Sequence, residues 1–273
     1  MDGPQGACGD HARRPRRGPE GAAQVKTVFI ADAHLGGLDD PAQKRLVRFL
    51  ESFHDAGVRR LVIVGDFFEF WTGFGEMVPL RYLPVLAALM EARAKGVEIV
   101  YVEGNHDFHM GRFFTDVLGA RVHDHACTVT LDGRRVIAIH GDTIGCTPGY
   151  SLWRAFLRSP VFRFLKTVLP PALFFHTAAR LSRRSRRKRG GGAAALERAM
   201  RAFARRKIAA GADVVITGHT HRPCVGEERG AHRRGIYANP GSCASTEPTC
   251  LVYEEGSFRI AALDDLMGEK PSA

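Results

Sequence analysis

Residues 98–108 read EIVYVEGNHDF, in which the apolar run Glu98–Val102 leads directly into the turn Gly104-Asn105-His106-Asp107. A β-branched and aromatic run that ends in small polar residues predicts a buried strand followed by a loop. In open α/β sheets, ligands bind just beyond the carboxyl ends of the strands. The loop after this strand is therefore a candidate for a functional site.

The same arrangement occurs twice earlier in the chain. Val25–Ala31 ends in Asp32-Ala33-His34, and Leu61–Val64 ends in Gly65-Asp66. Between these strands, apolar residues recur at helical spacing over Pro41–Ala56 and Leu80–Lys95. Alternating strands and helices predict an α/β fold that has a parallel sheet with helices on its faces.

The second half of the chain predicts antiparallel strands. Asp132-Gly133, between the runs Cys127–Leu131 and Arg135–His140, is a strong hairpin signal. Further strands are expected at Asp213–Thr217, around Tyr237, at Thr249–Tyr253 and at Phe258–Ala261. We expect one domain over residues 25–273, preceded by a disordered basic tail over residues 1–24 that has no apolar signal-peptide segment.

Composition limits the class of protein. No run approaches the roughly 18 apolar residues that a membrane span needs. The six cysteines form no C-x-x-C pair, so we expect reduced thiols and a cytoplasmic protein. The net charge of +10 is concentrated in one segment, because residues 150–210 alone carry about +15. This distribution indicates a local anionic partner.

Five polar clusters stand where an apolar strand is expected to meet a loop, and their order is Asp32-x-His34, Gly65-Asp66, Gly104-Asn105-His106-Asp107, His140-Gly141-Asp142 and Gly218-His219-x-His221. Each cluster alone is more often a turn or a strand-end accident than a ligand set. All five together predict one site. The i, i+2 spacing of the Asp-x-His and His-x-His pairs would place both side chains on one side of an extended backbone.

Seven oxygen and nitrogen donors suit two divalent metal ions that share one carboxylate. The candidate ligands are Asp32, His34, Asp66, Asn105, His140, His219 and His221. Only two of the seven are charged, so the loaded centre would be positive and would attract a phosphodiester or a pyrophosphate.

This ordered set of motifs resembles the calcineurin-like metallophosphoesterases, from about Val25 to Ala262. The resemblance implies a β-sandwich of two mixed sheets flanked by helices. It also implies one metal held by Asp32, His34, Asp66 and His221, and another held by Asp66, Asn105, His140 and His219. His106 would stabilise the phosphoryl oxygens or protonate the leaving group, and Asp107 would orient His106. The expected metal is Mn²⁺, with Fe or Zn²⁺ as alternatives.

Further residues resemble the UDP-2,3-diacylglucosamine diphosphatase branch of that family. They are Gly65–Trp71, Gly104–Phe108 with Gly111–Phe114, and His140–Thr143, followed by a helical insertion at about residues 146–210. Enzymes of that branch cleave the pyrophosphate of a nucleotide-linked diacyl sugar to UMP and the lipid 1-phosphate, at the inner membrane surface, in lipid A biosynthesis. Its best-known members carry Arg at the position of His106, so this chain resembles a histidine-bearing subgroup.

The insertion supports a lipid substrate. Ser151–Leu169 mixes large apolar residues with Arg154, Arg158, Arg163 and Lys166, and Pro171–Leu181 adds Phe174 and Phe175. Basic amphipathic helices of this kind lie at anionic membrane interfaces, so we expect a lid that contacts acyl chains and the inner membrane. The alternative is a helix pair that packs its apolar face on the domain and leaves a solvated basic face.

Two other classes of function compete with this one. A nuclease of the same superfamily is disfavoured, because the aromatic residues near the cations are mostly Phe at helical spacing rather than base-stacking platforms. A generic phosphodiesterase stays open as the alternative. A catalytically dead scaffold is disfavoured because all the expected ligands and His106 are present, and no obligate protein partner is indicated.

Overall fold

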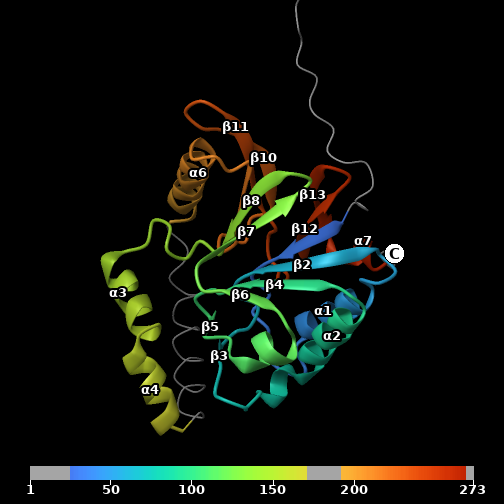
Figure 1. The fold of residues 1–273 in the computed structure, drawn as a ribbon, viewed down its shortest axis with the longest axis vertical. Helices are drawn as coiled ribbons and strands as arrows, with labels where there is room; N and C mark the ends of the chain where they lie inside the picture. The colour runs from blue at the N-terminus through green and yellow to red at the C-terminus, as the bar shows by residue number, and fades with distance from the viewer. Residues whose placement is uncertain (1–24, 171–191, 269–273) are drawn as a thin grey trace, which may run out of the picture.

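The structure, a computed structural model, describes residues 25–170 and 192–268. Two main sheets form the centre of the molecule (Figure 1). The first has the order β13-β12-β1-β2-β4-β6 and the second the order β10-β11-β9-β8-β7. The strands of the first sheet are β1 (Lys26–Ile30), β2 (Val58–Val64), β4 (Glu98–Val102), β6 (Arg121–His123), β12 (Thr249–Glu254) and β13 (Ser257–Ala262). Those of the second are β7 (Ala126–Leu131), β8 (Arg134–Ile139), β9 (Val214–Thr217), β10 (Cys224–Arg229) and β11 (Arg234–Asn239).

Both sheets are mixed. Strands β1, β2, β4 and β6 run parallel, while β12 pairs antiparallel with β1 and with β13. In the second sheet, β8, β9 and β11 run parallel, and β7 and β10 are antiparallel edges. A further short pair joins β3 (Trp71–Thr72) to β5 (Asp107–Phe108). The predicted α/β sandwich of two mixed sheets is confirmed.

The core follows the two-residue period of the strands. In β1, Val28 and Ile30 pack with the helices that cover the first sheet, while Phe29 faces the second sheet. The covering helices are α1 (Pro41–Glu51), α2 (Leu83–Ala94) with the short η1 (Leu80–Tyr82), and α7 (Leu263–Leu266). On the outer face of the second sheet, α6 (Ala193–Ala209) buries Met200, Ala204 and Ile208. The result is a four-layered α/β/β/α arrangement.

The expected elements differ from the observed ones in several places. The first helix ends at Glu51 rather than Ala56, since turns fill the residues before Gly57. The strand around Tyr237, expected to be antiparallel, is β11, which is antiparallel to β10 but parallel to β9. Strands β6 and β10 and the π-helical turn η2 (Phe113–Val117) were not predicted, because their short or polar sequences carry no clear period.

Two helices project from the sandwich, α3 (Pro148–Leu157) and α4 (Pro160–Val168) (Figure 1). Thr147 and Ser159 cap them, since each hydroxyl accepts a hydrogen bond from a first-turn N–H, and a proline follows each cap. They lie in the range 146–210, which was expected to be a lid, but α6 in the same range packs on the second sheet.

The predictions for residues 1–24, for Phe174 and Phe175, and for the run Arg183–Arg189 lie outside the described residues. Within residues 25–170 and 192–268, no helix is long and apolar enough to cross a membrane.

Candidate metal centre

The polar clusters predicted from the sequence meet at the carboxyl ends of five strands. Asp32 and His34 follow β1, Asp66 follows β2, Asn105 follows β4, His140 follows β8, and His219 and His221 follow β9. Their ligand atoms form groups in which every atom lies within 4.8 Å of the others: Asp32, His34 and His221; His34, Asp66 and His106; and Asp66, His140 and His219. Asn105 joins them through its Oδ1, which lies 3.3 Å from His140 Nε2.

Asp66 has the geometry of a shared ligand. Its Oδ1 accepts hydrogen bonds from the backbone N–H groups of Asn105 (2.8 Å) and His106 (2.9 Å). Its Oδ2 has no hydrogen-bond partner among the described residues and lies 3.4 Å from His140 Nε2 and 3.9 Å from His34 Nε2. One oxygen therefore fixes the side chain, and the other faces the histidines of two groups.

The two carboxylate oxygens of Asp32 differ in the same way. Its Oδ2 accepts the backbone N–H of His219 at 2.8 Å. Its Oδ1 lies 3.2 Å from His221 Nε2 and 3.8 Å from His34 Nε2, and it also lacks a hydrogen-bond partner in the described part of the chain. Buried carboxylate oxygens without donors are costly unless a cation neutralises them. This donor set therefore fits metal ions.

The backbone at these positions corrects one expectation. Asp32, His34, Asp66, His219 and His221 have φ values between 45° and 66°, so none of them is in an extended strand conformation. The i, i+2 pairs converge because each strand ends in a sharp left-handed turn. Residues other than glycine rarely adopt this conformation, and it costs about 1 kcal/mol or more at each position. Such outliers are typical of functional sites.

Histidine 140 is oriented by the strand beside it. Its Nδ1 lies 2.9 Å from the carbonyl oxygen of Val64, to which it donates, so Nε2 faces the cluster. Space for the ring depends on Gly65, where a Cβ would lie 2.6 Å from His140 Nδ1. Burial lowers the pKa of His140, but Asp66 and Asp32 outweigh burial and raise that pKa to about 10. The centre thus favours positive charge at this point.

Two other ionisable groups of the centre have shifted pKa values, Asp66 and His34. Burial opposes ionisation of Asp66, yet His140 and His106 hold the pKa of Asp66 well below its ordinary value. Burial also lowers the pKa of His34 to about 4, so the His34 imidazole is neutral at neutral pH. The ionised Asp66 carboxylate and the neutral His34 imidazole are thus in the protonation states that bind metal ions.

His106 lies beside the expected ligands on the turn after β4. Its Nδ1 donates to the carbonyl oxygen of Glu69 at 2.8 Å, and its Nε2 lies 3.9 Å from Asp66 Oδ2. The ring is therefore held from one side and presents Nε2 to the centre.

The expectation that Asp107 orients His106 is wrong. The Asp107 carboxylate accepts the backbone N–H groups of Asp66 (3.0 Å), Phe67 (2.5 Å), Phe68 (3.3 Å) and Gly104 (2.8 Å), together with the Tyr101 hydroxyl (2.6 Å). Consecutive residues of the short strand β5 and its approach point in different directions, so Asp107 points beneath the loops while His106 faces the centre. Burial and then Asp66 raise the pKa of Asp107 to about 7.

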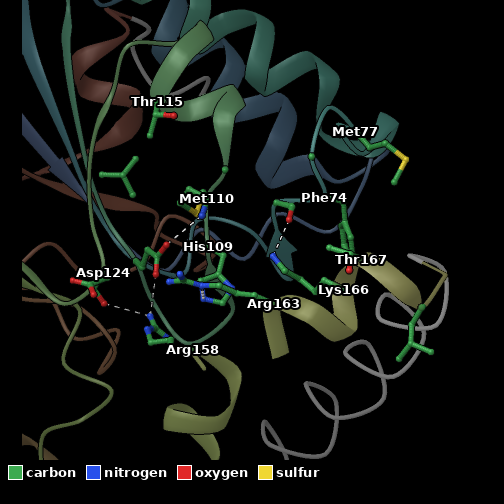
Figure 2. Close-up of a pocket in the computed structure, with 16 residues that line it drawn as sticks. Phe74, Met77, His109, Met110, Thr115, Asp124, Arg158, Arg163, Lys166 and Thr167 are labelled. Carbon is green, nitrogen blue, oxygen red and sulfur yellow. Dashed lines mark hydrogen bonds and ion pairs between the residues drawn. The ribbon is translucent and has the colours of Figure 1, made fainter. Parts of the chain in front are cut away.

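A cavity of about 840 Å³ lies next to this turn, beneath α4 (Figure 2). Its lining includes Glu103, His109 and Met110 from the segment around β5. Arg163 and Lys166 of α4 also line it, together with Arg158 at the C-cap of α3. Apolar lining comes from Phe74, Met77, Met110, Val122 and Leu169. Lys166 Nζ donates to Thr72 Oγ1 (2.9 Å) and to Gly73 O (2.8 Å), which fastens α4 to the core.

Comparison with known proteins identifies the class. Residues 25–223 match the calcineurin-like phosphoesterase family model, so the chain belongs to that family. Membership confirms the prediction of a hydrolase that acts on phosphoric esters or anhydrides.

Among curated proteins, the chain is similar to two enzymes named UDP-2,3-diacylglucosamine hydrolase. That of Aeromonas salmonicida is 33% identical, over 74% of this chain and 79% of the relative. That of Sodalis glossinidius is 29% identical, over 86% and 99%. A solved structure, the phosphoesterase Yfce of E. coli, is 23% identical, covers 89% of this chain and 95% of its own, and superposes with a TM-score of 0.44. The family match and the curated relatives confirm the resemblance drawn from the motifs.

Proposed function

We propose that this protein hydrolyses the pyrophosphate of UDP-2,3-diacylglucosamine to UMP and 2,3-diacylglucosamine 1-phosphate, using two divalent metal ions. The observation that carries this proposal is the juxtaposition of a His/Asp centre, organised around Asp66, with a cavity that has both cationic and apolar walls. A pyrophosphate joined to acyl chains requires both environments. The names of the relatives support the same substrate.

The proposed ligand sets share Asp66. Asp32, His34, Asp66 and His221 would hold one ion, and Asp66, Asn105, His140 and His219 the other. Support comes from Asp32 Oδ1 and Asp66 Oδ2, which accept no hydrogen bond from the described part of the chain, and from the convergence of the imidazole nitrogens on them. The donors are nitrogen and oxygen without thiolate, which suits Mn²⁺, Fe or Zn²⁺, and we propose Mn²⁺.

When bound, such ions lower the pKa of water and neutralise the oxygens of the phosphoryl group. The chain itself supplies orientation and a proton. His106 presents Nε2 beside Asp66, so in its protonated form it can donate a hydrogen bond or a proton to the departing phosphate oxygen. Water attacks phosphorus, the P–O bond to the sugar phosphate breaks, and the Glu69 carbonyl keeps the ring in place.

The cavity beneath α4 would receive the acylated sugar phosphate. Its volume falls in the range of about 300–1,000 Å³ that is usual for ligand sites. Lys166 uses two of its three N–H groups on Thr72 and Gly73, so the third remains for an anionic oxygen. Arg163 adds a second cation at the same wall. Phe74, Met77 and Leu169 provide apolar surface for acyl carbons, each worth about 0.8 kcal/mol when buried.

We also propose that the protein lies on the cytoplasmic surface of the inner membrane, with α3 and α4 toward the lipid. Leu152 and Phe164 are 74% and 65% exposed, and Val161 and Val168 are exposed beside them. Arg163, next to Phe164 on the same helix, is exposed as well. Exposed apolar side chains interspersed with cations favour an anionic lipid interface.

Mass spectrometry of reaction products tests the substrate. Purified protein with Mn²⁺ should release UMP and the lipid 1-phosphate from UDP-2,3-diacylglucosamine, and it should act on the deacylated nucleotide sugar much more slowly. A simple phosphodiester and a cyclic nucleotide serve as comparison substrates. Equal kcat/KM for acylated and deacylated substrates would contradict the lipid assignment and leave a generic phosphodiesterase.

A further inference from the structure

Helix α3 exposes its apolar side chains and directs its polar side chains toward the core, which is the reverse of an ordinary surface helix. None of its residues is fully buried, and its large apolar residues Leu152, Trp153 and Phe156 are 74%, 47% and 38% exposed. Its polar residues Tyr150 and Arg154, and Arg158 at its C-cap, recur every four positions, so they share one face. The Arg154 side chain is only 16% exposed and that of Arg158 is 14% exposed. The polar face therefore points toward the core.

The first two residues of this polar face, Tyr150 and Arg154, hold the loop after β8. The Tyr150 hydroxyl donates to Asp142 Oδ2 at 2.7 Å, and Arg154 Nε donates to the same oxygen at 2.8 Å. Arg154 Nη2 also donates to the Asp124 carbonyl oxygen at 3.3 Å. Asp142 is buried and stands two residues after His140. Charge-assisted hydrogen bonds of this kind are about twice as strong as neutral ones.

The last residue of the polar face, Arg158, holds the loop after β4. Arg158 Nη2 donates to the Gly104 carbonyl oxygen (3.2 Å) and to Glu103 Oε2 (3.3 Å), immediately before Asn105. The guanidinium also lies 5.6 Å from the centre of the Phe108 ring. One face of one helix thus contacts two loops that carry expected metal ligands.

We infer that Tyr150, Arg154 and Arg158 are positioning residues that dock the α3–α4 lid on the loops after β4 and β8. The loops have their own supports, because Asp107 holds one and the Val64 carbonyl holds His140. Tyr150, Arg154 and Arg158 therefore determine the position of the lid relative to the centre, and they do not determine the shape of the centre itself. A substrate that spans the cavity and the centre needs this placement, whereas a small phosphodiester does not. The choice of spanning substrate rests on the proposed function.

The test compares two substrates in lid variants of the full chain. Arg154→Met keeps an unbranched apolar stem but removes the guanidinium and its charge, and Tyr150→Phe removes only the hydroxyl. A misplacement of about 1 Å can cost roughly 10²-fold in rate. We expect Arg154→Met to lower kcat/KM for UDP-2,3-diacylglucosamine by about that factor, with a fall in kcat as well as a rise in KM. Hydrolysis of bis(p-nitrophenyl) phosphate and metal content should stay near wild type.

Controls separate this role from a general loss of stability. Arg198→Met removes the same charge from an exposed position on α6 and should leave both substrates unaffected. Arg154→Lys should recover part of the activity because it restores a cation opposite Asp142. Tyr150→Phe combined with Arg154→Met should cost less than the sum of the two, since both bond one oxygen.

Two outcomes would overturn the inference. If kcat/KM falls equally for both substrates and metal is lost or the melting temperature drops, these residues only support the fold. If Arg154→Met discriminates between the two substrates as the wild type does, the position of the lid does not depend on Arg154. Failure of the proposed function looks different, because the wild type itself would then not prefer the acylated substrate. If Arg154→Met does not fold, Tyr150→Phe and Arg154→Lys give the same comparison.

Discussion

Asp66 and Leu152 represent two contrasting regions of this molecule. The Asp66 carboxylate is completely buried, and two backbone N–H groups fix one of its oxygens. Leu152 is 74% exposed on a helix that attaches to the core through polar contacts on its other face. The candidate metal centre is thus part of the core of the sandwich, whereas helices α3 and α4 are docked onto it. Chemistry and substrate choice should therefore respond to different mutations.

Asp66→Ala is expected to have the largest effect, because both proposed metal positions lose a donor. Changes outside the ligand shell already cost about 10–100-fold in metal affinity, so loss of the shared ligand should cost more at both positions. Elemental analysis after dialysis measures the metal stoichiometry, with Asp32→Ala as the control that removes a ligand from one position only. If Asp66→Ala keeps two ions while Asp32→Ala loses them, Asp66 does not bridge.

His106→Ala should affect the reaction without affecting the metal. Its ring is held by Glu69 and faces the centre, but it is outside the two proposed ligand sets. Loss of an acid catalyst typically costs about 10²–10⁴-fold, and we expect kcat to fall in that range for both large and small substrates. Steady-state kinetics and elemental analysis on one preparation check this. Loss of a metal ion in His106→Ala would instead make His106 a ligand, as its proximity to His34 and Asp66 permits.

Lys166 should make substrate capture depend on pH. Burial, and then the neighbouring Arg163, lower the pKa of Lys166 to about 8. Its ammonium form is present below that pH and is lost as the pH rises above it, so the third N–H donor for an anion weakens. We expect kcat/KM for the diacyl substrate to decline above about pH 8, and less so in Lys166→Arg, whose guanidinium stays charged. The same decline with bis(p-nitrophenyl) phosphate would assign the titration to the centre instead.

Outward-facing lid residues should have the smallest effect on stability. Leu152→Ser and Phe164→Ser alter exposed side chains, so the free energy of unfolding should change by no more than about 0.5 kcal/mol. Sedimentation with phosphatidylglycerol vesicles should nevertheless decrease, and wild-type binding should weaken as salt screens the cations. Met90→Ser on α2 is the matched control for an exposed apolar residue away from the lid. Unchanged vesicle binding in the lid variants would remove the membrane from the proposal.

Strand periodicity and strand-end polar residues are local signals, so they predicted the strands and the convergence of the clusters. The sandwich of two sheets was implied by the family resemblance. Glu98–Val102 was predicted residue for residue as β4. The left-handed conformation of Asp32 and His219 could not be predicted, because bonds to residues far along the chain impose it, such as the bond from His219 N–H to Asp32. The pattern Asp-x-His occurs both in strands and in turns, so it does not predict the backbone conformation.

The lid demonstrates a second limit. One reading of Ser151–Leu169 assumed that the apolar face packs on the domain, yet α3 exposes Leu152 and Trp153 and turns Arg154 inward. An amphipathic pattern defines two faces but does not say which of them meets the core. The buried acceptor Asp142 decides this, and it could have been suspected from the His140-Gly141-Asp142 cluster. Its partners on α3 could not have been inferred from spacing alone.

The Asp107 carboxylate also has a consequence for hydrogen exchange. It receives the amide hydrogens of Asp66, Phe67 and Phe68 from a segment about forty residues earlier in the chain. Because Asp107 is completely buried, we expect these amides to meet solvent only when the loop after β2 separates from β5 and the core opens. Loops usually exchange quickly, but this one should exchange only at the rate of global unfolding, like a central strand. The backbone around Asp66 would then be among the last parts of the molecule to take up deuterium.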